Sequence, residues 1–493
     1  MMIKSLCTIL LTVGLLTGCA CSNDTAVSEN PGTAVLCDKV LPITGTFVNL
    51  AYQDVRNKYT NPVSSDMTDP LLWQAKVKEM KEFGVEYIVF MAVANEGRAY
   101  YPSSLMPWHY PETRTSPVDA IMDAAADCGI KVFMSTGWAV DQDDNLRIPA
   151  IKNRQIEMMT EFAGLYKNHP ALYGWYLPVE DCLGPVLSDY AVNAVNSLSQ
   201  KARQLTPDKK ILISPYGIFN SDFSDPRYAD QICSLKVDII AYQDEIGCVR
   251  EDYPLTRLRD NWKKLRAVHD RCGIEMWANC ESFAWEGNTN DRTSALIPAS
   301  FSRLLSQQAA ATAGGAERII SFMITGIYEP LLSSYRLGQP HWSNVAYDDY
   351  MAWKSGDRYW SVVEASLTGR YGPLATEDFR DPRWRFYEAD ESLIHDMGEE
   401  TTLKSVLVRM LHSRKDKILP PSLLSLYTSM DGENYTLRQI LSCPAFPNDR
   451  HDTFVDNVYL DKFEPVPARY VKISFNADSR AAFDRLVINP DLD

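Results

Sequence analysis

The sequence lacks the short motifs that mark several enzyme classes. It has no G-x-G-x-x-G or G-x-x-x-x-G-K phosphate loop, no G-x-S-x-G nucleophile turn and no H-E-x-x-H zinc motif. Its 7 histidines and 11 cysteines include no C-x-x-C pair and no spacing typical of metal ligands. Nucleotide-dependent and serine-hydrolase functions therefore have no support, and we expect neither a metal nor another cofactor.

Positive charge is also scarce. The 493 residues include 49 Lys and Arg against 64 Asp and Glu, which gives a formal net charge of -15. An acidic surface repels phosphate backbones, so we expect no nucleic-acid partner. The hydrophobic fraction of 45% and the charged fraction of 23% are those of a folded globular protein, and they exclude a disordered or fibrous chain.

Long hydrophobic runs are absent, and the N-terminal apolar stretch Ile9–Leu16 is too short to span a bilayer. It is followed by Leu16-Thr17-Gly18-Cys19, which resembles the bacterial lipobox. That resemblance implies that residues 1–18 are a signal peptide and that Cys19 carries the lipid. Ala20 in place of Asp implies release to the outer membrane. Residues 19–42 are polar and small, as in a tether, so we expect a lipid-anchored outer-membrane protein that faces the periplasm or the cell surface.

Short β-branched or aromatic runs alternate with longer amphipathic stretches in residues 43–360. The runs are Thr44–Ala51, Tyr87–Ala94, Lys131–Trp138, Leu172–Leu177, Lys210–Pro215, Val237–Tyr242, Glu275–Cys280 and Arg318–Thr325. Eight strands with intervening helices predict a (β/α)8 TIM barrel. A doubly wound open sheet is the alternative. It usually has a glycine-rich turn after the first strand, where this chain has Tyr52-Gln53-Asp54-Val55-Arg56.

The pattern changes after residue 360. Helical periodicity fades and alternating runs appear, separated by turn signals such as Asp431-Gly432. Residues 361–493 are therefore predicted to form an all-β sandwich. Cys128, Cys233 and Cys272 lie in helical or helix-end positions, where we interpret them as small buried thiols rather than disulfides.

Two glutamates are the sharpest catalytic candidates. Glu180 follows the fourth predicted strand and Glu281 follows the seventh, and the C-terminal ends of barrel strands carry the reacting groups. Two carboxylates facing each other across a cleft suit glycosidic bond cleavage, one as proton donor and the other as base or nucleophile. A lone Glu at such a position more often pairs with Arg, but the two together favour catalysis.

Further polar and aromatic residues gather at the same strand ends. Asp244 and Glu245 either hold sugar hydroxyls, supply the base of an inverting mechanism, or belong to a solvated loop. Other side chains are candidates for stacking on a sugar or for hydrogen bonds to its hydroxyls. These are Asn49, Trp138, Tyr216, Tyr242, Trp277, Asn279 and Tyr328.

The pattern of Glu180 and Glu281 resembles the large clan of retaining glycosidases with (β/α)8 barrels. This implies that Glu180 is the acid/base and Glu281 the nucleophile. Members of that clan usually have Asn before the acid/base, whereas this chain has Val179. More closely, the chain resembles a group of glycosidase-like barrel lipoproteins from gut bacteria. The matching stretches are Gly174-Trp175-Tyr176-Leu177-Pro178-Val179-Glu180, Ala241-Tyr242-Gln243-Asp244 and Trp277-Ala278-Asn279-Cys280-Glu281.

The C-terminal part resembles the discoidin jelly roll. The stretches that carry the resemblance are Asp396-Met397-Gly398, Ser429–Tyr435, Ala468–Ile473 and Asp484–Ile488. The sequence thus predicts a glycoside hydrolase acting on an oligosaccharide or polysaccharide. The alternative is a non-catalytic glycan-binding lipoprotein with a degenerate barrel. A protein-interaction scaffold is disfavoured by the polar, aromatic rim.

Overall fold

The computed structural model describes residues 39–50, 58–59, 67–110, 114–138, 146–248, 255–287, 293–337, 342–371, 379–388, 390–413, 416–443, 453–476 and 480–490. The predicted signal peptide, Cys19 and most of the predicted tether lie outside these residues. Within them, no helix is long and apolar enough to cross a membrane.

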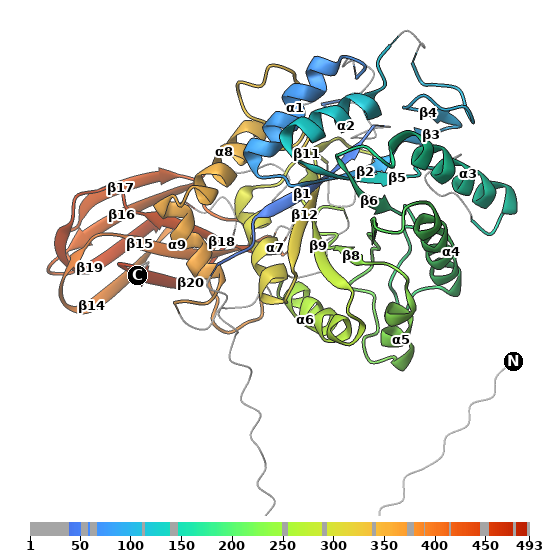
Figure 1. The fold of residues 1–493 in the computed structure, drawn as a ribbon. Coiled ribbons are helices and arrows are strands. Elements are labelled where there is room, and N and C mark those ends of the chain that lie inside the picture. The colour runs from blue at the N-terminus through green and yellow to red at the C-terminus, as the bar shows by residue number, and fades with distance from the viewer. Residues whose placement is uncertain are drawn as a thin grey trace, which may run out of the picture. The chain divides into compact units, whose positions relative to one another are not determined.

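Eight parallel strands close into a barrel in the described part of the chain, as Figure 1 shows. In chain order they are β1 (Ile43–Asn49), β2 (Tyr87–Ala92), β5 (Lys131–Ser135), β6 (Leu172–Tyr176), β7 (Lys210–Ile213), β8 (Ile239–Gln243), β9 (Glu275–Glu281) and β12 (Arg318–Phe322). Each pairs with its neighbour in this order, and β12 closes on β1. Every predicted strand is present, and the predicted TIM barrel is confirmed.

Helices surround the strands (Figure 1). They are α1 (Pro70–Phe83), α2 (Pro117–Cys128), α3 (Pro149–Tyr166), α4 (Asp189–Leu205), α5 (Pro226–Ser234), α6 (Leu255–Cys272), α7 (Phe301–Ala313), α8 (Ser343–Lys354) and α9 (Arg358–Leu367). Capping side chains and glycines determine where several of these helices begin and end. The Asp69 and Ser116 side chains cap the first turns of α1 and α2, and Gly84 and Gly129 end the same helices in the left-handed conformation.

Strand alternation separates two apolar clusters. Inward side chains fill the barrel, among them Phe47, Tyr87, Phe133, Tyr176, Leu212, Ala241, Trp277 and Ile320. Side chains one residue along, such as Tyr242 and Cys280, belong to the larger cluster between strands and helices. The same alternation decides which residues reach the mouth of the barrel, the end at which the strands terminate.

Two short hairpins lie beyond the barrel strands. One pairs β3 (Ala94–Asn95) with β4 (Arg98–Ala99), and the other pairs β10 (Phe283–Trp285) with β11 (Leu296–Pro298). They follow β2 and β9 directly, so they belong to the loops at the C-terminal ends of these strands.

A disulfide joins Cys233 of α5 to Cys272 at the end of α6. The interpretation of these two residues as buried thiols is therefore wrong. They are 39 residues apart in the chain, and only the packing of α5 beside α6 brings their Cα atoms to 4.8 Å. Cys128 is a free cysteine, as expected, but it is only half-buried.

His269 is a buried histidine of α6 that faces β8. Its Nε2 accepts a hydrogen bond from the Tyr242 hydroxyl at 2.7 Å, and its Nδ1 donates to the Ile274 carbonyl at 2.7 Å. Burial lowers the pKa of His269 to about 4, helped by the nearby charge of Arg266. The neutral imidazole is therefore the form that fits the fold.

We expect His269 to make stability pH-dependent. The unfolded state takes up a proton near pH 6.5, whereas the folded state does so only near pH 4, so stability falls as the pH drops through this window. The loss amounts to about 3 kcal/mol once the pH is below 4. Urea denaturation at a series of pH values measures it, and His269→Gln should flatten the curve between pH 6.5 and 4. If the free energy of unfolding changes equally with pH in both proteins, His269 is not the cause of the pH dependence.

The C-terminal part forms two four-stranded antiparallel sheets. One has the order β13 (Arg385–Tyr387), β20 (Ala481–Ile488), β15 (Val406–Ser413) and β18 (Thr453–Leu460). The other has the order β14 (Glu391–Leu403), β19 (Val466–Phe475), β16 (Leu423–Ser429) and β17 (Thr436–Ser442). Their inner faces share an apolar core, which confirms the predicted β-sandwich. The discoidin likeness stays a prediction, and the predicted boundary at residue 360 falls within α9.

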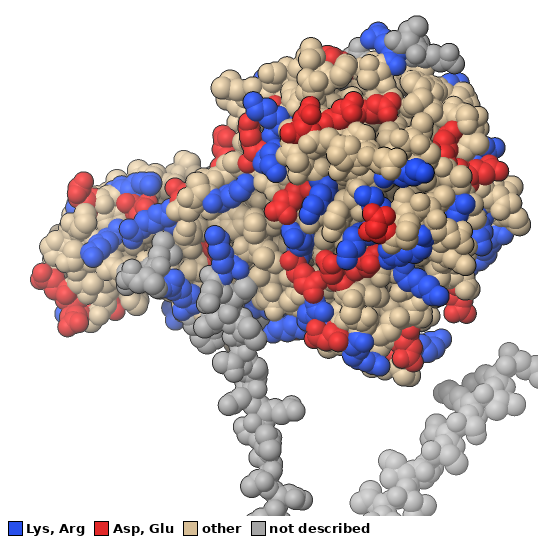
Figure 2. All heavy atoms as spheres, in the orientation of Figure 1, with Lys and Arg blue, Asp and Glu red and all other residues tan. Residues whose placement is uncertain are grey.

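Charge is mixed on the face of the molecule shown in Figure 2. Lys and Arg side chains are interspersed there with Asp and Glu side chains. This pattern is typical of a solvated protein surface.

Candidate active site

The mouth of the barrel gathers the predicted glutamates. Glu281 is the last residue of β9 and has the parity of Trp277, which points inward. Glu180 is half-buried and follows β6 by four residues. Strands β6 and β9 are separated by β7 and β8 around the closed barrel. The two glutamates therefore come from well-separated parts of the same rim.

Tyr216 marks the open part of this rim. Its side chain is 38% exposed, whereas most aromatic residues of the barrel are buried. Burial raises the pKa of the Tyr216 hydroxyl, and so do Cys182, Asp181, Glu180 and Glu245, in that order. Tyr216 thus lies on the loop after β7, between the loops that carry Glu180 after β6 and Glu245 after β8.

Backbone contacts hold these loops together. The Leu183 amide donates to the Tyr216 carbonyl at 2.8 Å, and the Gly217 amide donates to Glu245 Oε2 at 2.8 Å. Gly217 has a φ of 89°, and a Cβ there would lie 2.6 Å from Cys182 Sγ. A larger residue would therefore separate the loop after β7 from the loop after β6.

The Glu281 carboxylate is held by the loop after β8. Its Oε2 accepts hydrogen bonds from the amides of Gly247 at 2.8 Å and Cys248 at 2.6 Å. The residue is 5% exposed. Two backbone donors to a carboxylate oxygen stabilise the ionised form and fix its orientation.

Asp244 lies behind Glu281 rather than in the mouth. It is fully buried, and its Oδ1 accepts from the amides of Ile246 and Glu281, both at 3.1 Å. Its Oδ2 accepts from Gln307 Nε2 of α7 at 2.7 Å. Burial raises the pKa of Asp244 although these donors oppose the shift. Asp244 therefore positions Glu281, and it is Glu245 whose side chain joins the rim.

Helix α7 contributes residues that the sequence analysis did not nominate. Arg303 donates to the carbonyls of Glu281 at 3.2 Å and Phe283 at 2.5 Å, and Gln307 donates to the Glu281 carbonyl at 3.1 Å. Both side chains are buried, which is unusual for Arg and Gln. Nothing in the sequence of α7, which also contains Ser302, Ser306 and Thr312, distinguishes these two residues.

Several buried polar atoms of the barrel part of the chain have no protein partner among the described residues, and two of them belong to inward-facing residues. These two are the Trp138 Nε1 donor and the Asn279 Oδ1 acceptor. Trp138 belongs to the cluster that fills the barrel, and Asn279 has the inward parity of Trp277 and Glu281. Buried polar groups normally have a partner, so a donor and an acceptor of this kind suit a polar ligand.

The remaining candidates are buried, and Tyr242, Trp277 and Tyr328 point away from the rim, whereas Asn49 ends β1 at the rim. The Tyr242 ring faces α6 through His269, and the Trp277 indole donates to Glu275 at 3.2 Å near the other end of the barrel. Asn49 is 1% exposed at the end of β1. Tyr328 donates to the Ala299 carbonyl at 3.1 Å.

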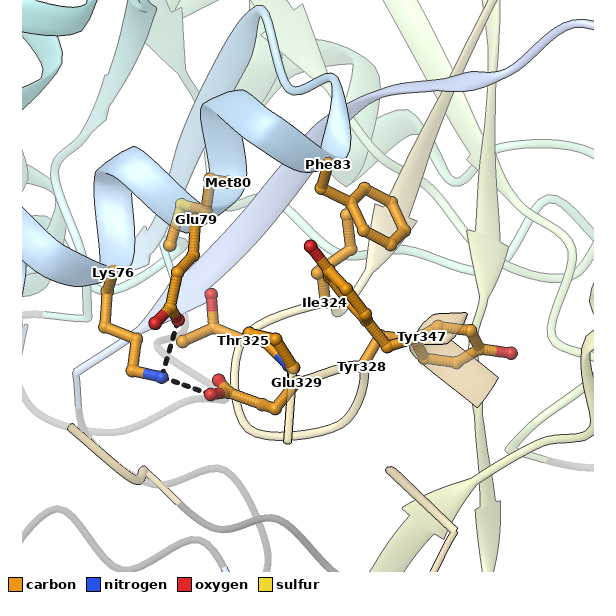
Figure 3. A pocket seen from close by; sticks show the side chains of 10 residues that line it. Lys76, Glu79, Met80, Phe83, Ile324, Thr325, Tyr328, Glu329 and Tyr347 are labelled. Carbon is orange, nitrogen blue, oxygen red and sulfur yellow. Dashed lines mark hydrogen bonds and ion pairs between the residues drawn. The ribbon is translucent and has the colours of Figure 1, made fainter. Parts of the chain in front are cut away.

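Tyr328 lines a small cavity outside the barrel, between α1 and the loop after β12 (Figure 3). The cavity measures about 10 Å³. In it Lys76 pairs with Glu79 at 2.9 Å and with Glu329. This volume is that of about one water molecule, so the cavity is a packing feature and not a substrate site.

One family model, described as a domain of unknown function (DUF4434), matches residues 43–333, which is more than half of the chain. The chain belongs to this family. The DUF4434 match covers the barrel strands and ends within the loop that follows β12. No curated protein matches the chain.

Solved structures resemble parts of the DUF4434 chain. A protein assigned as an α-L-fucosidase from Bacteroides thetaiotaomicron is 19% identical, with a TM-score of 0.50, over 68% of this chain and 99% of its own. A glycoside hydrolase family 5 protein from Bacteroides vulgatus is 10% identical, with a TM-score of 0.40, over 89% of both chains. At an identity of 19% the likeness to the first of these structures shows the fold alone.

Proposed function

We propose that the chain is a glycoside hydrolase whose active site is the mouth of the barrel. The observation that carries this proposal is the grouping of Glu180, Glu245 and the exposed Tyr216 on one rim, with Glu281 inward on β9. Carboxylates beside an exposed aromatic ring suit a sugar, because the ring stacks on its apolar face and the carboxylates act on its oxygens.

The proposed roles follow from the contacts. Glu281, held by two amide donors, is the ionised carboxylate that attacks the anomeric carbon or activates water. Glu180, half-buried near Tyr176 and Tyr216, donates the proton to the leaving oxygen. Trp138 Nε1 and Asn279 Oδ1 are the groups proposed to bind sugar hydroxyls.

The proposed location is the outer membrane, with Cys19 as the lipid anchor. The disulfide between Cys233 and Cys272 supports export, because disulfides persist in the periplasm and outside the cell but are rare in the cytosol. The partners are then a membrane, through the lipid, and an oligosaccharide or polysaccharide.

The test is a screen of plant and host glycans with detection of new reducing ends. We expect the wild-type protein to release reducing ends from at least one glycan class. The anomeric configuration of the first product, read by NMR, then separates retention from inversion. If no glycan is cleaved while one is bound, hydrolysis is excluded for that glycan.

Such an outcome would favour the second candidate, a glycan-binding lipoprotein with a degenerate barrel. One observation supports this alternative. Glu281 is 5% exposed and its Oε2 already accepts two backbone hydrogen bonds, as a purely structural carboxylate would. Titration calorimetry measures whether the glycan binds, and a search for product in the same sample shows whether it is cleaved. Binding without product identifies the second function.

A further inference from the structure

The two sheets of the sandwich differ in what covers them. The β13-β20-β15-β18 sheet packs on the helices that follow the barrel, where Val362 of α9 lies in one buried cluster with Leu407 and Tyr459. Hydrogen bonds add to this contact, among them Ser366 Oγ to Asn457 Oδ1 at 2.7 Å. In the other sheet several large apolar side chains are exposed instead, with Ile394 at 61%, Ile440 at 57% and Leu437 at 45%.

Strand register places these residues on one surface. Across β14, β19, β16 and β17, one row of paired residues is Ser392, Ser474, Ser425 and Ile440. The next row on the same side is Ile394, Lys472, Tyr427 and Leu437. The residues between the rows, such as Ile473 and Leu426, belong to the core. We call the surface of these two rows the outer sheet face.

Aromatic rings are fixed on the outer sheet face. The Lys472 ammonium lies 4.7 Å from the ring centre of Tyr427 and 4.2 Å from that of Tyr435. Tyr470 lies one row further, and its ring would be 3.2 Å from a Cβ at Gly432. The turn between β16 and β17 therefore packs on the face and holds the rings in place. The solvated face of an antiparallel sheet is normally polar, so this composition points to a ligand.

A hollow continues the face at the edge of the sheet where β14 and β16 begin and β19 ends. It has a volume of about 380 Å³. Its lining combines two carboxylates, three hydroxyls, an amide and two apolar side chains, which are Asp390, Glu391, Ser392, Leu423, Ser425, Ser474, Phe475 and Asn476. The hydroxyls of Ser392 and Ser474 share one hydrogen bond of 2.8 Å, so the accepting hydroxyl keeps its own proton for another acceptor.

We propose that the outer sheet face and its hollow form a second saccharide-binding site, separate from the mouth of the barrel. Sugar hydroxyls donate to the Glu391 carboxylate and exchange hydrogen bonds with the serine row, and the apolar face of the next sugar ring lies on Tyr427 and Leu437. The hollow has the size of a small-ligand site. Binding at this second site does not depend on hydrolysis in the barrel.

The composition of the face favours a saccharide over a protein partner. A stable protein interface buries about 800 Å² on each side around a desolvated apolar centre. Here Lys472 stands in the middle of the apolar row, between Ile394 and Tyr427, and six of the eight residues that line the hollow have polar side chains. Hydroxyls and carboxylates at the edge of an aromatic platform match a polyhydroxylated chain.

Affinity electrophoresis of the full chain tests this site, in gels that contain xylan, β-glucan, galactomannan or mucin. We expect at least one polysaccharide to retard the wild-type protein. Tyr427→Ala should weaken that retardation at least about tenfold, and so should Glu391→Gln, which alters the hollow without removing an aromatic ring. Leu165→Ser, an exposed position on α3, is the matched control and should bind as the wild type does.

The outcomes separate this site from the barrel. Glu180→Gln should keep the retardation even where it abolishes hydrolysis, so failure of the barrel proposal leaves the sandwich site standing. No retardation by any polysaccharide overturns the site, and so does equal retardation of Tyr427→Ala and the wild type. If light scattering shows a wild-type dimer that Tyr427→Ala dissociates, the occupant is a second copy of the chain and the proposal fails.

Discussion

Replacing Glu180 or Glu281 by Gln is expected to lower kcat/KM on the glycan found by screening by at least about 100-fold. Gln has almost the shape of Glu but neither donates a carboxylic proton nor carries negative charge. Glu180→Gln should remove the proton donor, and substrates with good leaving groups should be less affected because they need no protonation. Glu281→Gln should lose activity on all substrates.

The matched control is Glu157→Gln, which removes a carboxylate from an exposed position on α3. It should retain full activity. Circular dichroism melting curves show whether each variant is folded, which matters most for Glu281 because its carboxylate joins two loops. Full activity in both Glu180→Gln and Glu281→Gln would eliminate this carboxylate pair, and Glu245→Gln would then test the remaining glutamate of the rim.

The second large effect is expected at Lys76, whose ammonium group is buried in the small cavity beside α1 (Figure 3). It donates to Glu79 at 2.9 Å and to Ser333 at 2.8 Å, and it pairs with the buried Glu329. Lys76→Met leaves the Glu329 carboxylate without its main counter-charge. Removing one partner of a buried ion pair typically costs about 3–5 kcal/mol, and we expect a loss of this size in urea denaturation.

The direction of a pH effect follows from the same pair. Burial raises the pKa of Glu329, and Lys76 is the largest influence that lowers it. Without Lys76 the carboxyl takes up a proton at higher pH, so the loss in Lys76→Met should be smaller at pH 5 than at pH 8. Lys76→Met/Glu329→Gln should recover most of the stability. Lys78→Met, exposed on the same helix, should stay within about 0.5 kcal/mol of the wild type.

The architecture was accessible from the sequence because it depends on local patterns. Buried parallel strands are short apolar runs, and each is followed by an amphipathic stretch with capping residues. These patterns can be recognised in the sequence without knowing which strands are neighbours in the barrel. The change from helical periodicity to alternating runs is equally local, so the sandwich could be predicted too, although the helix α9 continues to Leu367.

The site was accessible only in part, because parity at a strand end depends on the register of the barrel. In the run Tyr242-Gln243-Asp244-Glu245, the sequence analysis proposed Tyr242, Asp244 and Glu245 as groups that bind substrate. The structure turns Tyr242 and Asp244 toward helices and brings Glu245 to the rim. A shift by one residue would exchange their places, and no local signal determines that shift.

The sequence by itself determined the barrel, the sandwich and the strand ends at which polar groups gather, because each follows from periodicity along the chain. Only the tertiary structure decided which residues far apart in the chain contact each other. Cys233 meets Cys272, Lys76 meets Glu329 and Gln307 supports Asp244 because folded helices bring distant residues together. The outer sheet face likewise exists only after strands far apart in the chain are aligned in register.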